Sequence, residues 1–198
     1  AALKKSAKGD ANIKSVCCSY KTKRRNKLMN EAKIHNVLFI CTGNSARSVL
    51  AESILNREGK GRFKAFSAGS HPSGKVHPLA IDLLKLMDYP TEHLRSKDWL
   101  EFAEPEAPKM DFTFTVCDNA AGEVCPVWPG HPMTAHWGLK DPAAFNGPEV
   151  EHRAFFLDIF KQINLRINTF VNLPMSSLDQ LDVQRNLNDI GQTLSETA

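Results

Sequence analysis

Residues 37–52 read VLFICTGNSARSVLAE, and this stretch predicts a buried strand, a tight loop and the start of a helix. The apolar residues Val37–Ile40 form the short uninterrupted run that is typical of a strand covered on both faces. Turn-forming residues follow at positions 43–45, where the glycine would let the backbone come close to a ligand. From Ser48 onward, apolar residues recur at helical spacing. The stretch therefore places Cys41 at the carboxyl end of a strand, directly before a loop and a helix.

The loop at positions 41–48 has the residues expected of an oxyanion site. Its backbone N–H groups and the positive end of the following helix would attract a tetrahedral anion, and the guanidinium of Arg47 could hold two of its oxygens. The same field predicts that the pKa of Cys41 falls to roughly 3.5–7.5, which would make the thiolate a nucleophile at neutral pH. We expect Ser48 to hydrogen-bond that thiolate and Asn44 to brace the loop. The predicted anion-binding positions are Thr42, Gly43, Asn44, Ser45, Ala46, Arg47 and Ser48.

Two other interpretations fit this loop less well. Cys41 could be a structural cysteine in an ordinary turn, but the apolar strand before the loop and the helix after it favour a binding site. The loop also lacks the G-x-x-x-x-G-K-[ST] pattern, which argues against a nucleotide triphosphatase.

The rest of the chain alternates between strand and helix patterns at the spacing of βαβ units. This alternation predicts an α/β fold of three layers, with a four-stranded parallel sheet and helices on both of its faces. The expected strands are 37–40, 62–67, 112–116 and 134–138. The expected helices are 48–58, 78–89, 96–102, 149–173 and an extra C-terminal helix at about 177–194. We expect Ser96 to cap the third helix, and Ser177 with Gln180 to form a capping box for the last.

Cys117 and Cys125 flank seven residues rich in turn formers, just after the third expected strand. The chain between them could fold back until their Cα atoms lie within the ~4.4–6.8 Å that a disulfide requires. A zinc site that recruits His131 and His136 is a competing interpretation, although the spacing matches no common zinc pattern. Two unreactive core cysteines are another. Ligands bind at the carboxyl ends of strands in such sheets, so we expect Cys41 and Cys117 to share one site.

Asp141 precedes Pro142 on a loop that follows the fourth expected strand. Proline holds the preceding residue in an extended conformation, so this carboxyl group could reach the anion site and act as a general acid. A simple Asx turn before proline is the alternative interpretation of the same residues.

Charge is distributed unevenly along the 198 residues. Residues 1–28 carry nine Lys or Arg and one acid, whereas the formal net charge of the whole chain is only +3. This leader lacks the apolar segment of a secretory signal, and its composition suits a disordered tail. We expect the tail to be non-native, with Met29 as the native start of a single domain over 29–198. A nucleic-acid or anionic-surface arm around Lys21–Lys27 is the alternative.

Two features of composition bear on location. No apolar run approaches the ~20 residues that a membrane span needs. Five cysteines without a secretory signal favour a reducing compartment, so we expect a cytoplasmic protein.

The sequence Cys41-Thr-Gly-Asn-Ser-Ala-Arg47-Ser48 resembles the active-site loop of the low-molecular-weight protein tyrosine phosphatases and of the arsenate reductases that share their fold. The resemblance covers roughly residues 36–174. Within it, VCDNAAGEVCPVWPGHPMTAHWGLKDP at 116–142 looks like the thiol-linked reductases. Ala143 and Ala144 stand where the phosphatases typically carry aromatic residues. Ala46 is a departure, since some relatives place another cysteine there.

The resemblance implies that the chain reduces arsenate to arsenite. It assigns Cys41 as the nucleophile, Arg47 as an anion ligand and Asp141 as the general acid. It further implies a disulfide relay that passes from Cys41 to Cys117 and then to Cys125. Thioredoxin, or glutathione with glutaredoxin, would reduce the final disulfide.

No cofactor is implied, and we expect a monomer without nucleic-acid or membrane partners. Some relatives hold a potassium ion beside the loop, for which the oxygen donors would be Asn44, Glu52 and Ser67. Two alternatives stay open. One is a low-molecular-weight phosphatase, and the other is a regulator that binds oxyanions or senses thiol oxidation without turnover.

Overall fold

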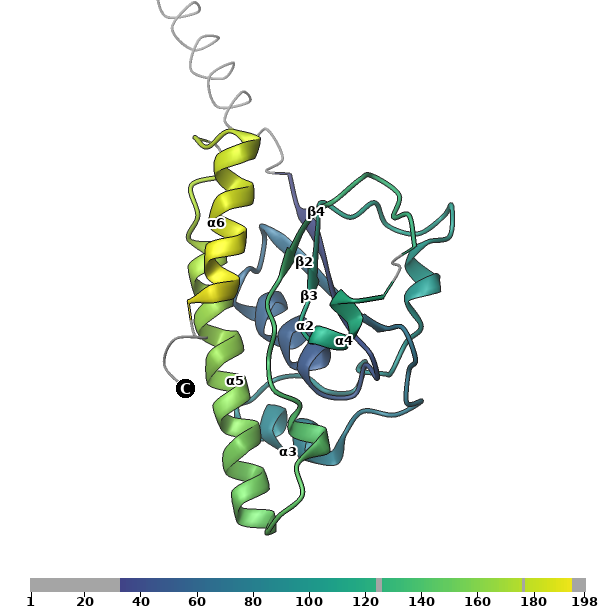
Figure 1. Ribbon diagram of the computed structural model, residues 1–198, viewed down its shortest axis with the longest axis vertical. Helices are drawn as coiled ribbons and strands as arrows, with labels where there is room; N and C mark the ends of the chain where they lie inside the picture. Colours follow the sequence, from purple (N-terminus) through teal and green to yellow (C-terminus); the bar gives the residue numbers. More distant parts are fainter. Residues whose placement is uncertain (1–32, 124–125, 176, 194–198) are drawn as a thin grey trace, which may run out of the picture. The chain divides into compact units, whose positions relative to one another are not determined.

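Four parallel strands form the centre of the computed structural model of this chain (Figure 1). The sheet has the order β2-β1-β3-β4, and its strands are β1 (His35–Cys41), β2 (Phe63–Gly69), β3 (Phe112–Thr115) and β4 (Met133–His136). The structure describes residues 33–123, 126–175 and 177–193, and all of them except Lys33 belong to a unit that spans 34–198. The expectations for the basic leader and Met29 lie outside the described residues.

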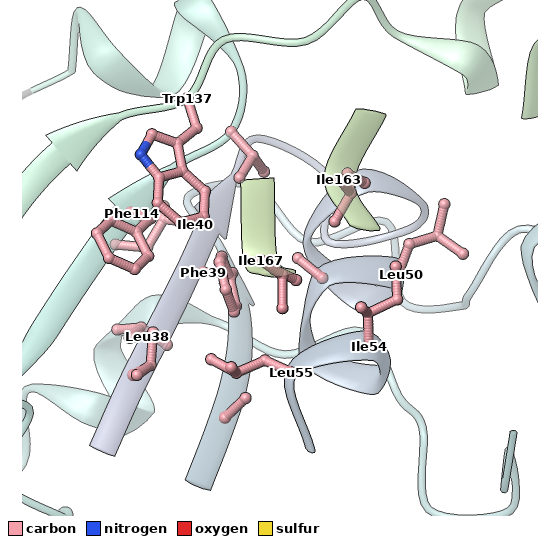
Figure 2. Close-up of a cluster of buried hydrophobic side chains, with 14 of the residues drawn as sticks. Leu38, Phe39, Ile40, Leu50, Ile54, Leu55, Phe114, Trp137, Ile163 and Ile167 are labelled. Carbon is pink, nitrogen blue, oxygen red and sulfur yellow. The ribbon is translucent and has the colours of Figure 1, made fainter. Parts of the chain in front are cut away.

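One face of the sheet carries an aromatic core. Helices α2 (Arg47–Glu58) and α5 (Glu149–Val171) cover this face and pack against each other. The ring of Phe170 lies 4.9 Å from that of Phe63 and 5.2 Å from that of Phe114, measured between centroids. Figure 2 shows side chains of β1, α2 and α5 converging in this layer, where Phe39 and Ile167 are fully buried. Burial of this layer fixes the register of β1, whose last residue is Cys41.

Shorter elements cover the opposite face. The 3-10 turn η1 (Trp99–Phe102) packs on β2, where the rings of Phe66 and Phe102 lie 5.6 Å apart. Helix α4 (Asp118–Ala121) contacts β1 and β3. Helix α3 (Pro78–Leu86) instead packs against α2 and α5, and η2 (Pro142–Ala144) packs against α5. The predicted three layers are confirmed, although the helices on this second face have only about one turn each.

The C-terminal helix α6 (Gln180–Gln192) covers the edge of the sheet along β4 (Figure 1). The indole Nε1 of Trp137 donates to the carbonyl of Leu187 at 2.9 Å, and the amide of Gln184 donates to the carbonyl of Thr134 at 2.7 Å. Gly191 lies against the carbonyl of His136, so closely that a side chain there would collide with it. The helix therefore completes the core and protects an edge that would otherwise expose unpaired backbone groups.

Most predicted elements are confirmed within a few residues, but two predicted caps are wrong. The side chain of Asp98, not Ser96, caps η1, and the hydroxyl of Ser96 donates instead to the carbonyl of Gly43 at 3.1 Å. Asp179, not Ser177, caps α6, which begins at Gln180. In both cases an aspartate, which caps helices about as well as serine does, stands two positions nearer to the helix. None of the helices that the structure describes is both long and apolar enough to span a membrane.

The contact of Gly191 with β4 leads to a stability prediction. We expect Gly191→Ala to lower the free energy of unfolding by about 1–3 kcal/mol, because the added methyl must push α6 away from the carbonyl of His136. The matched control is Gly122→Ala, where a methyl would meet its nearest atom at an ordinary 3.6 Å. Urea denaturation measures both, and equal stabilities for the two variants would contradict the close packing of α6.

Candidate active site

Two free thiols lie together at the carboxyl edge of the sheet. Strands β1 and β3 are direct neighbours, which brings Cys41 at the end of β1 close to Cys117 just after β3. The hydroxyl of Thr42 lies 3.6 Å from the Sγ of Cys117. Both thiols are only 2% exposed, and neither forms a disulfide. The structure thus brings the two thiols into one site, as the sequence predicts.

The loop after Cys41 has the geometry of an anion cradle. The carbonyls of Thr42, Gly43 and Ser45 accept hydrogen bonds of 2.8–2.9 Å from backbone N–H groups in the segment 71–77. Because a peptide unit is planar and trans, the N–H that follows each carbonyl points the opposite way, into the loop. Within the described ranges, the N–H groups of Gly43 and Ala46 have no hydrogen-bond acceptor. These donors are therefore available to an oxyanion.

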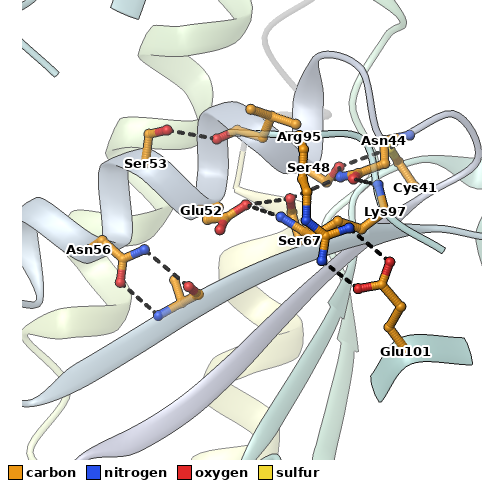
Figure 3. A network of polar contacts seen from close by, with 12 residues as sticks. Cys41, Asn44, Ser48, Glu52, Ser53, Asn56, Ser67, Arg95, Lys97 and Glu101 are labelled. Carbon is orange, nitrogen blue, oxygen red and sulfur yellow. Dashed lines mark hydrogen bonds and ion pairs between the residues drawn. The ribbon is translucent and has the colours of Figure 1, made fainter. Parts of the chain in front are cut away.

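The side chain of Asn44 braces the cradle (Figure 3), as predicted. It adopts a left-handed φ of 44°, which asparagine tolerates better than most residues. Its amide nitrogen donates to Ser48 and to Ser67, each at 2.9 Å, and its amide oxygen accepts from the backbone of Lys97 at 2.6 Å. These bonds fix a side chain that is fully buried, so the loop is shaped before any ligand arrives.

The thiol of Cys41 makes the expected hydrogen bond with Ser48, but the prediction of a lowered pKa is wrong. Ser48 lies 3.0 Å from the sulfur and the backbone N–H of Asn44 lies 3.1 Å from it. Burial nevertheless raises the pKa of Cys41, and the neighbouring Cys117 raises it further. The bond from Ser48, the charge of Arg47 and the bond from Asn44 oppose this rise. Desolvation of the thiolate, which sequence reasoning left out, is the larger effect here.

Arg47 joins the cradle to the loop that carries the predicted general acid. Its guanidinium donates to the carbonyl of Leu139 at 2.9 Å and pairs with a carboxylate oxygen of Asp141, also at 2.9 Å. The other oxygen of Asp141 accepts from the N–H of Ala143 at 3.1 Å. Asp141 therefore makes an Asx turn before proline and also faces the site, so the two interpretations of this residue hold together.

The second cysteine loop is described in part. Cys117 is the residue before α4, whose four residues were not predicted to be helical. Cys125 lies outside the described residues, so its proposed pairing with Cys117 stays a prediction. Among the residues that the structure describes, which include His131 and His136, no three His, Cys, Asp or Glu side chains are placed to hold a metal ion.

The residues of the suggested potassium site converge, and a lysine joins them. The hydroxyl of Ser67 donates to the carboxylate of Glu52 at 2.5 Å, while Asn44 donates to Ser67. The ammonium of Lys97 lies 3.0 Å from the same carboxylate, and both charged side chains are 8% exposed. Glu52 thus already has a cationic partner within the protein (Figure 3). The potassium site itself stays a prediction.

Sequence reasoning missed several residues around the site. Lys97 has no signal in its own neighbourhood, because its partner Glu52 is 45 positions away. His152 donates to the carbonyl of Pro142 at 2.7 Å and so supports the loop of the acid. His77 lies beside it, and burial together with the charge of His152 lowers the pKa of His77. Of the residues around the site, only those of the loop 41–48 can be recognised from a local sequence pattern.

The bond between Ser48 and Cys41 leads to a prediction on pH. We expect Ser48→Ala to move the midpoint of Cys41 alkylation upward by about one pH unit, because the variant loses a donor to the thiolate. Ser53→Ala is the matched control, since that hydroxyl sits on the same helix and donates to the carbonyl of Val49. Iodoacetamide kinetics, with the modified peptide identified by mass spectrometry, measure the midpoint. An unchanged midpoint in Ser48→Ala would show that the hydroxyl does not stabilise the thiolate.

The buried pair of Lys97 and Glu52 leads to a prediction on stability. Removing one member of a buried ion pair leaves the other charge uncompensated, so we expect Lys97→Met to lower the free energy of unfolding by about 3–5 kcal/mol. Arg95→Met is the control, because its pair with Glu101 is exposed and worth about 0–1 kcal/mol. The double variant Glu52→Gln/Lys97→Met should recover much of the loss. Equal losses for Lys97→Met and Arg95→Met would contradict this account.

Comparisons with known proteins agree with this geometry. The profile of the low molecular weight phosphotyrosine protein phosphatase family matches residues 36–184. The arsenate reductase of Halalkalibacterium halodurans is 33% identical over 134 residues, which cover 68% of this chain and 93% of that protein.

Solved structures give the same result. An arsenate reductase from Archaeoglobus fulgidus superposes with a TM-score of 0.54 at 26% identity, over 68% of this chain and 98% of that one. A thioredoxin-dependent arsenate reductase from Corynebacterium glutamicum has a TM-score of 0.50 at 22% identity, over 82% of this chain and 75% of its own, a likeness of fold. The chain therefore belongs to the low molecular weight phosphotyrosine protein phosphatase family, and within that family it is similar to the arsenate reductases.

Proposed function

We propose that this protein reduces arsenate to arsenite by a thiol–disulfide relay. The observation that carries the proposal is a second free thiol, Cys117, buried at the same sheet edge as Cys41 in its oxyanion cradle. Hydrolysis of a phosphate ester needs only the first thiol, whereas reduction of an oxyanion by two electrons needs two. The relatives named arsenate reductase support the same activity.

The first step forms a bond between sulfur and arsenic. Arsenate has the shape and charge of phosphate, so it would bind to the free N–H groups of the loop and to the guanidinium of Arg47. Although burial raises the pKa of Cys41, its thiolate form, which Ser48 and Asn44 stabilise by hydrogen bonds, is the form that attacks arsenic. One arsenic–oxygen bond breaks, and the oxygen leaves as water with a proton from Asp141. For this step Asp141 has to carry a proton, and its distance of 2.9 Å from Arg47 supports its access to the anion that Arg47 binds.

The second step reduces arsenic. The thiolate of Cys117 attacks the Sγ of Cys41, a disulfide forms and the sulfur–arsenic bond breaks. The electron pair of that bond stays on arsenic, which passes from As(V) to As(III) and leaves as arsenite. The hydroxyl of Thr42, 3.6 Å from the sulfur of Cys117, lies where it can donate to the attacking thiolate.

The third step restores the nucleophile. The thiolate of Cys125 attacks Cys117 and releases Cys41 as a thiolate, so that the disulfide moves to the Cys117–Cys125 pair. An external dithiol then reduces this pair. Thioredoxin fits a disulfide carried away from the cradle, and glutathione with glutaredoxin is the alternative, which would make Cys125 dispensable. We place the reaction in the cytoplasm, where such reductants are available.

Phosphatase activity is the second candidate function, because the cradle and the nucleophile serve both reactions. One observation disfavours it as the main activity. Ala143 and Ala144 follow the Asp-Pro pair, and the first aromatic residue after them, Phe145, packs on His152 and Phe155 at 5.3 and 5.6 Å. The loop therefore lacks adjacent rings after Asp-Pro to line a phosphotyrosine pocket.

Arsenate-dependent oxidation of NADPH, coupled through thioredoxin and its reductase, tests the relay. We expect Cys117→Ser to lower turnover by more than about a hundredfold, since the sulfur that accepts the disulfide is lost. The double variant Cys17→Ser/Cys18→Ser, which removes the two cysteines of the basic leader, is the control and should keep full activity. Hydrolysis of p-nitrophenyl phosphate, which needs only Cys41, should survive in Cys117→Ser. Hydrolysis without any arsenate turnover in the parent protein would mean a phosphatase. Tight oxyanion binding with neither product would mean a regulator.

A further inference from the structure

A chain of hydrogen bonds joins the start of helix α4 to the end of strand β4. The Nε2 of His136 lies 3.0 Å from a carboxylate oxygen of Asp118, and its Nδ1 lies 2.9 Å from the hydroxyl of Thr115. Asp118 directly follows Cys117 and is the first residue of α4. The imidazole thus connects the end of β3, the end of β4 and the residue next to the second thiol.

Helix α4 is too short to be stable without contacts to the rest of the protein. It has four residues, and a single turn of helix is not stable by itself in water. Its N-cap position is Cys117, whose side chain makes no capping hydrogen bond. The helix is therefore held from outside, by its contacts with β1 and β3 and, among the side chains that the structure describes, by the hydrogen bond from His136 to Asp118.

The acid loop, which is the segment 137–141 between β4 and η2, passes close to this contact. A Cβ atom at position 138 would lie 2.7 Å from the carboxylate of Asp118 and 2.7 Å from the Nε2 of His136. A side chain at position 138 would therefore push the ends of these two side chains aside. The contact therefore lies against the loop that leads to Asp141.

The contact contributes little to the stability of the fold. The side chain of His136 is 42% exposed and that of Asp118 is 87% exposed, and exposed pairs of this kind stabilise proteins weakly. Neither side chain is among the predicted cradle residues. We therefore expect the pair to act through the residue that it positions. That residue is Cys117, which is next to Asp118 and must face Cys41 in the proposed relay.

We propose that His136 is a positioning residue that holds Asp118, and with it Cys117, in place to attack Cys41. The inference rests on the proposed relay and adds a component to it. The hydrogen bond between His136 and Asp118, which we call the tether, is exposed and therefore easily broken. It thus also lets Cys117 leave once its disulfide with Cys41 has formed. His136 thereby favours the first exchange without trapping the thiol for the second.

The test compares two amides at position 136 in the full chain carrying Cys125→Ser, which stops the relay at the first disulfide. Glutamine places its amide near the position of Nε2 and keeps a donor for Asp118, whereas asparagine reaches only the position of Nδ1. The readout is the effective concentration of Cys117 at Cys41, from the fraction of their disulfide in buffers of reduced and oxidised glutathione. One glutathione disulfide supplies the two-electron oxidation and yields two glutathione thiols. Peptide mapping by mass spectrometry identifies the bond.

We expect His136→Asn to lower the effective concentration roughly tenfold, and His136→Gln to stay within about twofold of the parent. Asp118→Ala should match His136→Asn, and His93→Asn, at an exposed histidine elsewhere, should change nothing. An asparagine variant equal to the parent, or a glutamine variant as weak as asparagine, would overturn the proposal. The assay uses no arsenate, so a failure of arsenate turnover in the parent protein would count against the proposed function and not against the tether.

Discussion

The geometry of the site depends most on the guanidinium of Arg47. Arg47 is the first residue of α2, and its side chain reaches Leu139 and Asp141 on the loop that follows β4. This one side chain joins the cradle of the nucleophile to the loop of the acid across more than ninety positions of sequence. A lysine would offer a single ammonium and could not make both contacts in the same fixed plane. The distance between nucleophile and acid is therefore set by a rigid group that is itself buried.

The acid loop is held from its other side by the C-terminal part of the chain. Arg166 on α5 donates to the carbonyl of Gly138 at 3.2 Å and to that of Gly191, in the last turn of α6, at 3.1 Å. Burial lowers the pKa of Arg166, and the negative end of α6 supplies some compensation for its charge. Trp137 stacks on Phe114 at 4.1 Å and bonds to α6 through its indole. The extra helix thus has a mechanical consequence, since it stiffens the backbone from which Asp141 extends.

Local patterns predicted what is local in the fold. The strand, cradle and helix at 37–52 are contiguous, so their residue types alone indicate both structure and chemistry. Helix α4 was missed because four residues carry too little periodicity to be recognised. The caps of η1 and α6 were misplaced because each region offers a serine and an aspartate two positions apart, and tertiary packing decides which of them begins the helix. The pairing of Lys97 with Glu52 depends on contacts that no spacing rule contains.

The pKa of Cys41 was predicted wrongly for the same reason, because it depends on surroundings that the fold creates. Sequence reasoning counted a nearby cation and a helix end, and from them inferred a stabilised thiolate. In the folded protein Arg47 pairs with Asp141 and Lys97 pairs with Glu52. Two hydrogen bonds and the charge of Arg47 lower the pKa of Cys41, but nearly complete burial, together with Cys117, raises it by more. A sequence shows which cationic side chains are present, but only the fold shows how deeply the thiol is buried, and burial has the largest effect on the pKa of Cys41.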